Sequence, residues 1–423
     1  MNYEQKYLKY KKKYVEAQTT NQTGGNPQPI IIDTDPGIDD ALAILLALGD
    51  PRVKVIALTT VFGNFPDVRL LTDNALKILN LANKRHIPVF EGVSKPLCEM
   101  NLTTYIRKTM SAQSIAVHGN DGLANLSVDE SIKLDKGGLV KESEHAVQAI
   151  IRLARENPGK ITLITLGPLT NLAAALDIEP NLPFLLKSVI IMGGSLFSPR
   201  GNPVNTSDAN LGNARPSAEA NFFKDPDAAQ IVLRAGFPVE NLFLIPLDLT
   251  TQTDYNEFGL TMDPTSLPEL KSGVIRNFIA KSHHYYSNIY KGFQRNKVPF
   301  HDACAVFLAI SSTSFTEKPP KISINVETKG ELTAGMTVID NRSHLPPTIR
   351  PPNNVTFYQN IKKEELYQAI ITSLNNLQDE LDARATLLYK PNGSLTDPKN
   401  RREVEPTEKN QFFARVLMNI SKP

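Results

Sequence analysis

The sequence predicts an α/β fold, built on a doubly wound, mostly parallel sheet with a small antiparallel addition. Short β-branched apolar runs such as Ile30-Ile31-Ile32 are too short for helices and are typical of buried strands. Several of these runs are followed by apolar residues at helical spacing, as over 41–48. Strands and helices that alternate with short connections indicate a parallel sheet covered on both faces.

The alternation begins at residue 29 and continues to 247, with an irregular stretch at 94–140 and a long loop at 195–221. The expected strands are 30–33, 53–61, 87–90, 161–166, 188–192 and 242–247, with an antiparallel pair at 321–326 and 332–338. The expected helices are 39–48, 67–82, 144–156, 170–176, 225–235, 272–290, 301–310 and 362–377.

Three regions are expected along the 423 residues: a leader and linker over 1–28, one domain over 29–380 and a polar extension over 381–423. The leader combines lysines with tyrosines at helical spacing, which fits either a basic amphipathic helix or a solvated tail. It resembles the lysine- and tyrosine-rich leaders of proteins from giant DNA viruses. That resemblance covers only this segment, and it would place the protein in the host cytoplasm or the virion.

The composition is that of an ordinary globular protein. The chain is 41% hydrophobic and 21% charged with a formal net charge of +2, so nothing indicates nucleic-acid binding. We find no apolar run of membrane-spanning length and no secretory h-region, and therefore expect a cytoplasmic protein without a membrane partner. The only cysteines, Cys98 and Cys304, offer no disulfide framework and suit a reducing compartment.

Four carboxylates crowd one strand-to-helix turn: Asp33, Asp35, Asp39 and Asp40. A Pro-Gly pair between them forces the turn and lets the backbone approach a ligand closely. One of these acids could cap the helix that follows. Four carboxylates within eight residues repel one another, however, unless a cation or a proton relieves the repulsion.

Other polar residues follow the ends of further expected strands. Asn64 follows the second strand, while Leu166 and Met192 end two later ones. Because ligands of open α/β sheets bind outside the carboxyl ends of the strands, these positions form a candidate pocket. His301-Asp302, at the start of an apolar helix, is a second acid site, although an aspartate there is also a common helix cap.

The available metal ligands are carboxylates and backbone carbonyls, without paired histidines or cysteines. Such hard oxygen ligands favour Ca²⁺ or Mg²⁺ over zinc, and a carbonyl in a flexible acid set favours Ca²⁺. A divalent ion lowers the pKa of a bound water, and a neighbouring carboxylate can take the proton. The sequence therefore predicts hydrolysis by an activated water.

The run from Asp33 to Ala41, Asp-Thr-Asp-Pro-Gly-Ile-Asp-Asp-Ala, resembles the signature of the inosine–uridine preferring nucleoside hydrolase family. The resemblance spans residues 29–377 and implies a nucleoside hydrolase-like, Rossmann-like core. The other matching motifs, in chain order, are Val61-Phe62-Gly63-Asn64, His118-Gly119 with Asp121-Gly122, Leu166-Gly167-Pro168-Leu169-Thr170-Asn171, Ile191-Met192-Gly193-Gly194, Gly212-Asn213, Glu219 with Asn221, Asp225-Pro226-Asp227-Ala228-Ala229, and His301-Asp302.

This resemblance implies that the N-glycosidic bond of a ribonucleoside is cleaved to ribose and free base. It implies a Ca²⁺ ion held by Asp35, Asp40, Asp302 and the Leu166 carbonyl, with Asp35 also the general base for the water. His301 would face the leaving base and could protonate it. The residues implied to hold the ribose are Asp39, Asn64, Met192, Asn213, Glu219 and Asn221, and His118 would lie near the base.

The resemblance also implies a nucleoside as small-molecule partner and a homo-oligomer, a dimer or tetramer. Asp33 would support the turn from behind the metal ligands. Taken singly, Asn64 could be a turn residue, Met192 a core residue, and Glu219 and Asn221 ordinary loop polars. The interpretation rests on their joint occurrence in order.

Two features depart from the family. Ala220 stands where the family usually has Phe, and both Asn202 and Asn213 follow a glycine, with the spacing to the next motif favouring Asn213. The purine-specific branch stacks the base between tryptophans; this chain has none, so uridine- or inosine-type substrates are expected. Tyr286 and Tyr290, one helical turn apart, could line the base pocket or pack in the core.

Two other functions fit part of the sequence. A haloacid-dehalogenase-like phosphatase also carries Asp-x-Asp after a strand, but it would need a hydroxyl or aliphatic residue where Gly37 stands. A catalytically silent nucleoside- or ribose-binding protein, or a virion structural protein on the same fold, would account for the terminal extensions. Against it, every predicted metal ligand and the base are present in the sequence.

Overall fold

The computed structural model describes residues 26–387, apart from 99–111, 113, 133, 197–211, 259–269, 294–296, 316–318, 341, 343, 347 and 350. Most of the predicted leader, most of the C-terminal extension and much of the 195–221 loop, including Asn202, therefore lie outside the described residues. The family resemblance falls almost entirely on residues that the structure does describe.

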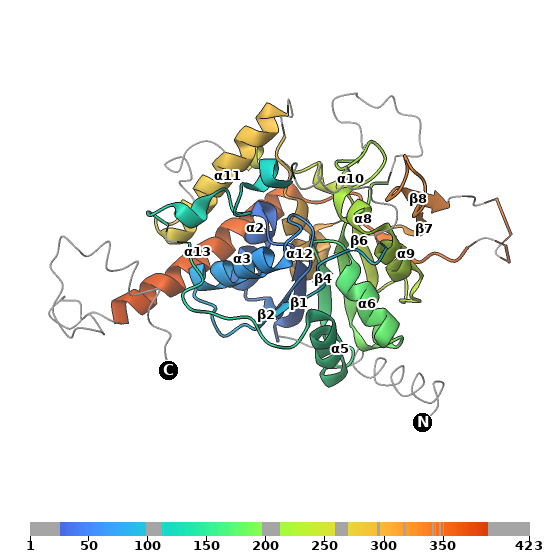
Figure 1. Ribbon diagram of the computed structural model, residues 1–423, viewed down its shortest axis with the longest axis horizontal. Helices are drawn as coiled ribbons and strands as arrows, with labels where there is room; N and C mark the ends of the chain where they lie inside the picture. Colours follow the sequence, from blue (N-terminus) through green and yellow to red (C-terminus); the bar gives the residue numbers. More distant parts are fainter. Residues whose placement is uncertain are drawn as a thin grey trace.

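One mixed sheet forms the centre of the described part of the chain (Figure 1). Its strands are β1 (Gln28–Thr34), β2 (Val53–Thr60), β3 (Val89–Glu91), β4 (Thr162–Thr165), β5 (Ser188–Met192), β6 (Leu242–Ile245), β7 (Lys321–Val326), β8 (Thr337–Asp340) and β9 (Val355–Phe357). Their spatial order is β3-β2-β1-β4-β5-β6-β9-β7-β8. All pairings from β3 to β9 in that order are parallel, whereas β7 pairs antiparallel with β9 and β8. The predicted mostly parallel sheet with an antiparallel addition is confirmed.

Alternate side chains of β1 enter two separate hydrophobic layers, because successive residues of a strand point to opposite faces. Ile30 and Ile32 belong to one layer and Ile31 to the other, and all three are fully buried. Burying each isoleucine contributes about 1.5–3 kcal/mol. The β-branched run therefore specifies the central strand of a sheet that is covered on both sides.

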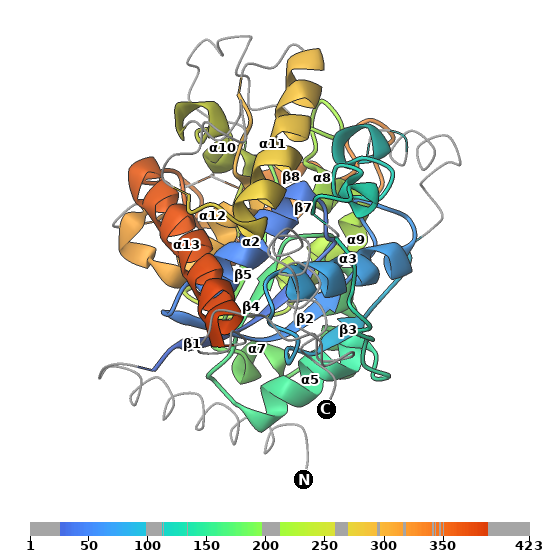
Figure 2. The ribbon, with the colours of Figure 1, turned by 90° about the vertical axis from the view of Figure 1, so that its left-hand side faces the viewer.

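Helices cover both faces of the sheet (Figures 1 and 2). On the face of Ile30 and Ile32 lie α2 (Ile38–Gly49), α3 (Val68–Leu81), α11 (Val274–Gly292), α12 (His301–Ile310) and α13 (Lys363–Leu387). On the face of Ile31 lie α5 (Ala146–Glu156), α6 (Thr170–Ile178), α7 (Leu182–Leu185) and α9 (Pro226–Arg234). Shorter elements are α8 (Ala220–Lys224), α10 (Leu247–Thr250) and the 3₁₀ turns η1 (Leu126–Val128), η2 (Tyr255–Phe258) and η4 (Ser312–Ser314). None of the described helices is both long and apolar enough to cross a membrane.

Three predicted element bounds are wrong. The strand expected at 332–338 begins only at Thr337, because residues 331–335 form a turn in which Gly335 has φ +84°. The strand expected at 242–247 ends at Ile245, since Pro246 caps α10. The last helix continues past 377 to Leu387, and the strand β9 was not predicted because three residues carry too little periodicity.

The strand order creates a switch point beside β1. The chain runs from β1 outward through β2 and β3, then returns to the opposite side of β1 as β4. At such a point the carboxyl ends of the strands diverge and leave a crevice. The turn from Asp33 to Asp40 and the residue Leu166, which follows β4, both lie at this crevice.

Candidate active site

Asp40 both begins α2 and lies in the acid cluster. Its Oδ2 accepts hydrogen bonds from the backbone N–H of Gly37 at 2.9 Å and from Asn64 Nδ2 at 3.1 Å, and its Oδ1 accepts one from the Thr34 hydroxyl. Burial raises the pKa of Asp40 to about 6, and the charge of Asp39 adds to the rise. Helix capping therefore accounts for one of the four acids, and the other three need another explanation.

Asp33 lies behind the turn and joins three elements. Its Oδ1 accepts hydrogen bonds from the Thr59 hydroxyl on β2 at 2.6 Å and from Asn171 Nδ2 on α6 at 2.7 Å. Burial raises the pKa of Asp33 to about 7, although both hydrogen bonds act to lower it. Asp33 supports the turn without lining the cavity.

Asp35 is buried beneath the loop that follows β2. Its Oδ2 accepts hydrogen bonds from the backbone N–H of Asn64 at 2.7 Å and from Lys224 Nζ at 3.2 Å. Burial raises the pKa of Asp35 well above its usual range; the ammonium of Lys224 opposes this rise and the charge of Asp40 adds to it. Asp35 is thus a buried carboxyl with one cationic partner, an environment in which its protonation state depends strongly on its neighbours.

Three aspartates form a compact group at the crevice. Asp39, Asp40 and Asp302 each offer a carboxylate oxygen within 4.8 Å of the others, and all three are buried. Burial raises the pKa of Asp302 well above its usual range, with the charges of Asp40, Asp39 and Asp35 adding to the rise. Asp39 Oδ1 is buried and makes no hydrogen bond within the described part of the chain. It lies 4.0 Å from His118 Nδ1, and an oxygen without a hydrogen bond among hard oxygen ligands fits a cation such as Ca²⁺ or Mg²⁺.

This group differs from the predicted ligand set in one member. The resemblance implied Asp35, Asp40 and Asp302 with the Leu166 carbonyl, whereas the group that the structure brings together contains Asp39 in place of Asp35. Asp35 instead forms an ion pair with Lys224 at 3.2 Å, a contact that sequence reasoning did not foresee. The Leu166 carbonyl lies nearby and accepts a hydrogen bond from Asn221 Nδ2 at 2.7 Å.

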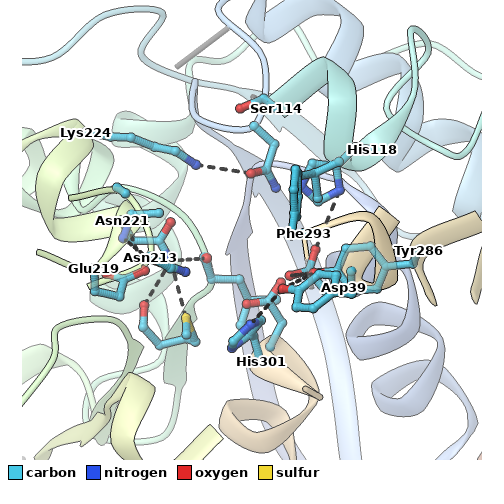
Figure 3. Close-up of a pocket in the computed structure, with 18 residues that line it drawn as sticks. Asp39, Ser114, His118, Asn213, Glu219, Asn221, Lys224, Tyr286, Phe293 and His301 are labelled. Carbon is cyan, nitrogen blue, oxygen red and sulfur yellow. Dashed lines mark hydrogen bonds and ion pairs between the residues drawn. The ribbon is translucent and has the colours of Figure 1, made fainter. Parts of the chain in front are cut away.

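A cavity of 380 Å³ opens above the acid group (Figure 3). In Figure 3, Glu219, Asn221 and Lys224 form one side and His118 and Tyr286 the other. Asp35 and Asp40 lie below its floor and do not line it. The predicted site residues in its wall are Asp39, Asn64, His118, Leu166, Met192, Asn213, Glu219, Asn221, Tyr286, Tyr290, His301 and Asp302; the unpredicted ones are Ser114, Val117, Ala214, Ala220, Lys224 and Phe293.

The first side of the cavity is held by α8. Glu219 caps this helix, accepting hydrogen bonds from the N–H of Asn221 at 2.8 Å and of Gly194 at 3.0 Å. Burial raises the pKa of Glu219, while these backbone donors act to lower it. Asn221 Nδ2 also donates to the Met192 carbonyl at 3.1 Å, and Asn213 Oδ1 accepts the N–H of Ala220 at 2.8 Å. The side chains predicted to hold a ribose are therefore fixed by one network.

The second side carries two histidines with different hydrogen-bond partners. His118 Nδ1 accepts the N–H of Ile38 at 3.2 Å, and burial lowers the pKa of His118 to about 4, so this ring is neutral near pH 7. His301 Nδ1 lies 2.8 Å from the Thr250 hydroxyl, and His301 Nε2 lies 3.3 Å from the Tyr290 hydroxyl. Both rings lie in the cavity wall, where a planar ligand group could meet them.

The sequence left open whether Tyr286 and Tyr290 line a pocket or pack in the core. In the structure they do both, since they are buried in the core and also line the cavity. Their hydroxyls lie 3.3 Å apart, and the Tyr286 hydroxyl donates to Asp39 Oδ2 at 3.5 Å. The ring of Tyr286 stacks on that of His118 with centroids 6.0 Å apart. The tyrosines therefore connect the histidines to the acid group.

Lys224 is the functional candidate that sequence reasoning missed. It lies between Asn221 and the motif that begins at Asp225, and a lysine is normally a solvated surface residue. The signal that could have found it is its position three residues after Asn221, since residues three apart share a helix face. In the structure both side chains line the cavity.

Comparison with known proteins agrees with this geometry. The profile of the family described as inosine-uridine preferring nucleoside hydrolase matches residues 30–368. The Leishmania major protein of that name is 34% identical over 331 residues, covering 77% of this chain and 91% of its own. A solved plant nucleoside hydrolase is 28% identical with a TM-score of 0.66, covering 82% of this chain and 99% of its own. A purine-preferring ribonucleoside hydrolase from Gardnerella vaginalis is 27% identical with a TM-score of 0.67, covering 83% of this chain and 99% of its own.

The family match extends over most of the chain and includes every motif quoted from the sequence. It excludes the phosphatase alternative, which accounted only for Asp33 and Asp35. The chain therefore belongs to the inosine–uridine preferring nucleoside hydrolase family and is a glycosidase that hydrolyses the N-glycosidic bond of ribonucleosides.

Proposed function

We propose that this protein hydrolyses uridine- or inosine-type nucleosides, with Asp35 as general base and with Ca²⁺ as its metal ion. The supporting observation is the buried group of Asp39, Asp40 and Asp302, of which Asp39 and Asp302 line the cavity. Buried carboxylates that lie this close repel one another, and a divalent cation relieves that repulsion. Carboxylates and the Leu166 carbonyl supply the oxygen ligands that Ca²⁺ prefers, although Asn64 Nδ2, His118 Nδ1 and Lys224 Nζ also lie near these acids.

The proposed metal ligands are Asp35, Asp40, Asp302 and the Leu166 carbonyl. A Ca²⁺ ion held there would lower the pKa of a bound water and orient it. Asp35 would accept the proton of this water, and burial raises the pKa of this carboxyl, which increases its basicity. Asp39, whose Oδ1 makes no hydrogen bond to described residues, would accept one from a ribose hydroxyl.

The remaining wall residues would act on the two products of bond cleavage. Positive charge develops on the ribose as the glycosidic bond breaks, and carboxylate and amide oxygens such as those of Glu219 and Asn221 stabilise it. Negative charge develops on the leaving base, and His301 would donate a proton to it. His118 is neutral near pH 7 and would serve the base as a hydrogen-bonding or stacking surface.

The substrate preference is inferred from the base side of the cavity. Its aromatic residues are Tyr286, Tyr290, Phe293 and two histidines, and the chain contains no tryptophan to stack a purine. The Leishmania major relative is named as inosine-uridine preferring and the Gardnerella vaginalis enzyme as purine-preferring. We place this chain with the former because hydroxyl and imidazole groups can hydrogen-bond the polar edges of uracil or hypoxanthine.

The decisive experiment measures reducing sugar released from uridine, cytidine, inosine and adenosine by the full-length protein, with Ca²⁺ and with a chelator. We expect release from uridine and inosine above the other two, and loss of release in the chelator. Preferential release from adenosine would contradict the substrate assignment. Full activity after verified removal of the metal would contradict the role of Ca²⁺.

A further inference from the structure

Lys224 places a positive charge inside the acid site. Its side chain is only 6% exposed, although it comes from the last residue of α8. Figure 3 shows it reaching across the cavity toward the loop that follows β2. A buried lysine is rare unless it is paired, so its partners define its role.

The ammonium of Lys224 has two partners, and both belong to the proposed catalytic machinery. Its Nζ donates to Asp35 Oδ2 at 3.2 Å and to Asn64 Oδ1 at 3.1 Å. The second contact fixes the orientation of the Asn64 amide, whose Nδ2 then donates to the Asp35 carbonyl at 3.0 Å and to Asp40 Oδ2 at 3.1 Å. One lysine therefore positions both a carboxylate and the amide beside it.

The contact with Lys224 distinguishes Asp35 from the other acids. Asp39, Asp40 and Asp302 bring their oxygens together within 4.8 Å, and Asp35 is not part of this group. Lys224 holds Asp35 instead, with its Nζ 3.2 Å from Oδ2 inside the same crevice. It thus neutralises part of the negative charge that a metal ion would otherwise neutralise alone.

We propose that Lys224 is a built-in counter-ion that competes with the divalent metal for Asp35, so that it stabilises the metal-free site and weakens metal binding. This inference rests on the proposed function, because it assumes that the metal binds among these aspartates. Lys224 is a positioning residue in this account: it acts through Asp35 and Asn64 and takes no part in bond cleavage.

The physical reason is electrostatic. A lysine and a divalent cation repel one another when both occupy the same buried acid cluster, where charges are screened less than in water. Replacing Lys224 by Met removes that repulsion and keeps the volume of the side chain. It also leaves the four carboxylates without their counter-ion when the metal is absent, which destabilises the metal-free protein.

The test compares the full-length wild type with Lys224→Met and Lys224→Arg, each melted in a chelator and in saturating Ca²⁺ while far-UV circular dichroism is followed. We expect Lys224→Met to melt below the wild type in the chelator. We also expect its Ca²⁺-induced rise in Tm to exceed that of the wild type by roughly 3 °C or more. Calorimetric titration of the folded proteins should show that Lys224→Met binds Ca²⁺ at least about ten-fold more tightly than the wild type does.

Two control variants test whether the change in the Ca²⁺-induced shift comes from the charge of Lys224 or from the loss of any half-buried lysine. Lys224→Arg keeps the positive charge and should retain a wild-type Ca²⁺-induced shift. Lys187→Met removes a half-buried lysine that is bonded to Gln28 at the opposite edge of the sheet, and it should leave the shift unchanged. If Lys224→Met is already unfolded in the chelator at room temperature, its Tm there lies below the start of the melt, and the Tm in Ca²⁺ then gives a lower bound for the Ca²⁺-induced shift.

The outcomes distinguish this inference from the proposed function. If the wild type responds to Ca²⁺ and hydrolyses nucleosides, an equal or smaller shift in Lys224→Met overturns the inference alone. If Lys224→Met responds to Ca²⁺ and the wild type does not, the inference stands and the wild type does not use Ca²⁺. No response in either protein overturns both the inference and the assignment of Ca²⁺.

Discussion

The four aspartates after β1 have different surroundings, and these surroundings set their roles. Asp33 is tied to β2 and α6 by hydrogen bonds, Asp35 is paired with Lys224, Asp40 caps α2, and Asp39 keeps an oxygen without a hydrogen bond among the described residues. The four carboxylates therefore have different roles. Asp33 supports the turn and Asp40 caps the helix, while Asp35 is the proposed base and Asp39 the proposed ligand-binding group. The difference lies in which neighbour each carboxylate contacts.

Substitution of Asp35 by Asn tests its proposed role as general base. The amide cannot accept the proton of water, so we expect kcat to fall by about 10² to 10⁴-fold. The matched control is Asp50→Asn, at the far end of α2, where Asp50 is paired with Arg52. Steady-state kinetics on uridine compare the two variants, and far-UV circular dichroism verifies their folds. Wild-type kcat in Asp35→Asn would assign the base to another residue.

At the scale of elements, the site is shaped by loops that leave no room for side chains. A Cβ added at Gly63, after β2, would lie 1.9 Å from Asp35 Oδ2, and one at Gly167, after β4, would lie 2.7 Å from Asp35 Oδ1. The loops after β2 and β4, on either side of β1, therefore both pack closely against the Asp35 carboxylate. Their glycines are required by this close approach of backbone to side chain.

Gly63→Ala should therefore impair the site more than the fold. The methyl group has to displace Asp35 from its position, so we expect kcat on uridine to drop at least ten-fold, with a loss of stability of about 1–3 kcal/mol. Gly292→Ala is the matched control, because a Cβ there meets no described atom within 4 Å. Kinetics and urea unfolding of both variants measure the two effects. Unchanged kcat in Gly63→Ala would show that Asp35 need not occupy its observed position.

At the scale of the whole molecule, the site combines residues from both ends of the domain. α12 lies against α2 and brings Asp302 beside Asp39 and Asp40, which are more than 260 positions earlier in the sequence. We expect the buried acids to make the stability of the molecule depend on both metal and pH. The predicted homo-oligomer, the cytoplasmic location and the resemblance of the leader to those of giant DNA viruses stay predictions.

The stability of the metal-free protein should fall as the pH rises from about 4 to about 7. Burial raises the pKa of Asp33 to about 7 and that of Asp40 to about 6, whereas an unfolded aspartate titrates near 3.9. The folded chain therefore binds more protons than the unfolded chain in this range, so the free energy of unfolding decreases with pH. Asp33 alone can contribute roughly 4 kcal/mol to this decrease.

Urea unfolding in a chelator between pH 4.5 and 7.5 measures this dependence. The variant Asp33→Asn, which cannot ionise, should show a shallower decline than the wild type. Saturating Ca²⁺ should stabilise the wild type more at pH 7.5 than at pH 5, because it binds the ionised carboxylates. A wild-type stability that rises across this range in the chelator would contradict the assignment of raised pKa values to these acids.

Much of the architecture could be predicted because local patterns encode it. The run Ile30-Ile31-Ile32 predicts a strand buried on both faces, and the structure confirms this. β9 could not be predicted, since its three residues are defined by pairing with β6 and β7. Likewise, Leu332 lies in a turn because the backbone around Gly335 bends there, although the composition of the segment suits a strand.

The sequence by itself determined the fold class, the family and most of the side chains that line the cavity, because β-branched runs, helical spacing and ordered motifs are local features. Only the tertiary structure decided which carboxylates lie together and which one meets a cation. It groups Asp39 with Asp40 and Asp302, and it directs Lys224 to Asp35. Such choices depend on how α8 and α12 pack across the switch point, and no local pattern encodes the distance between side chains from separate elements.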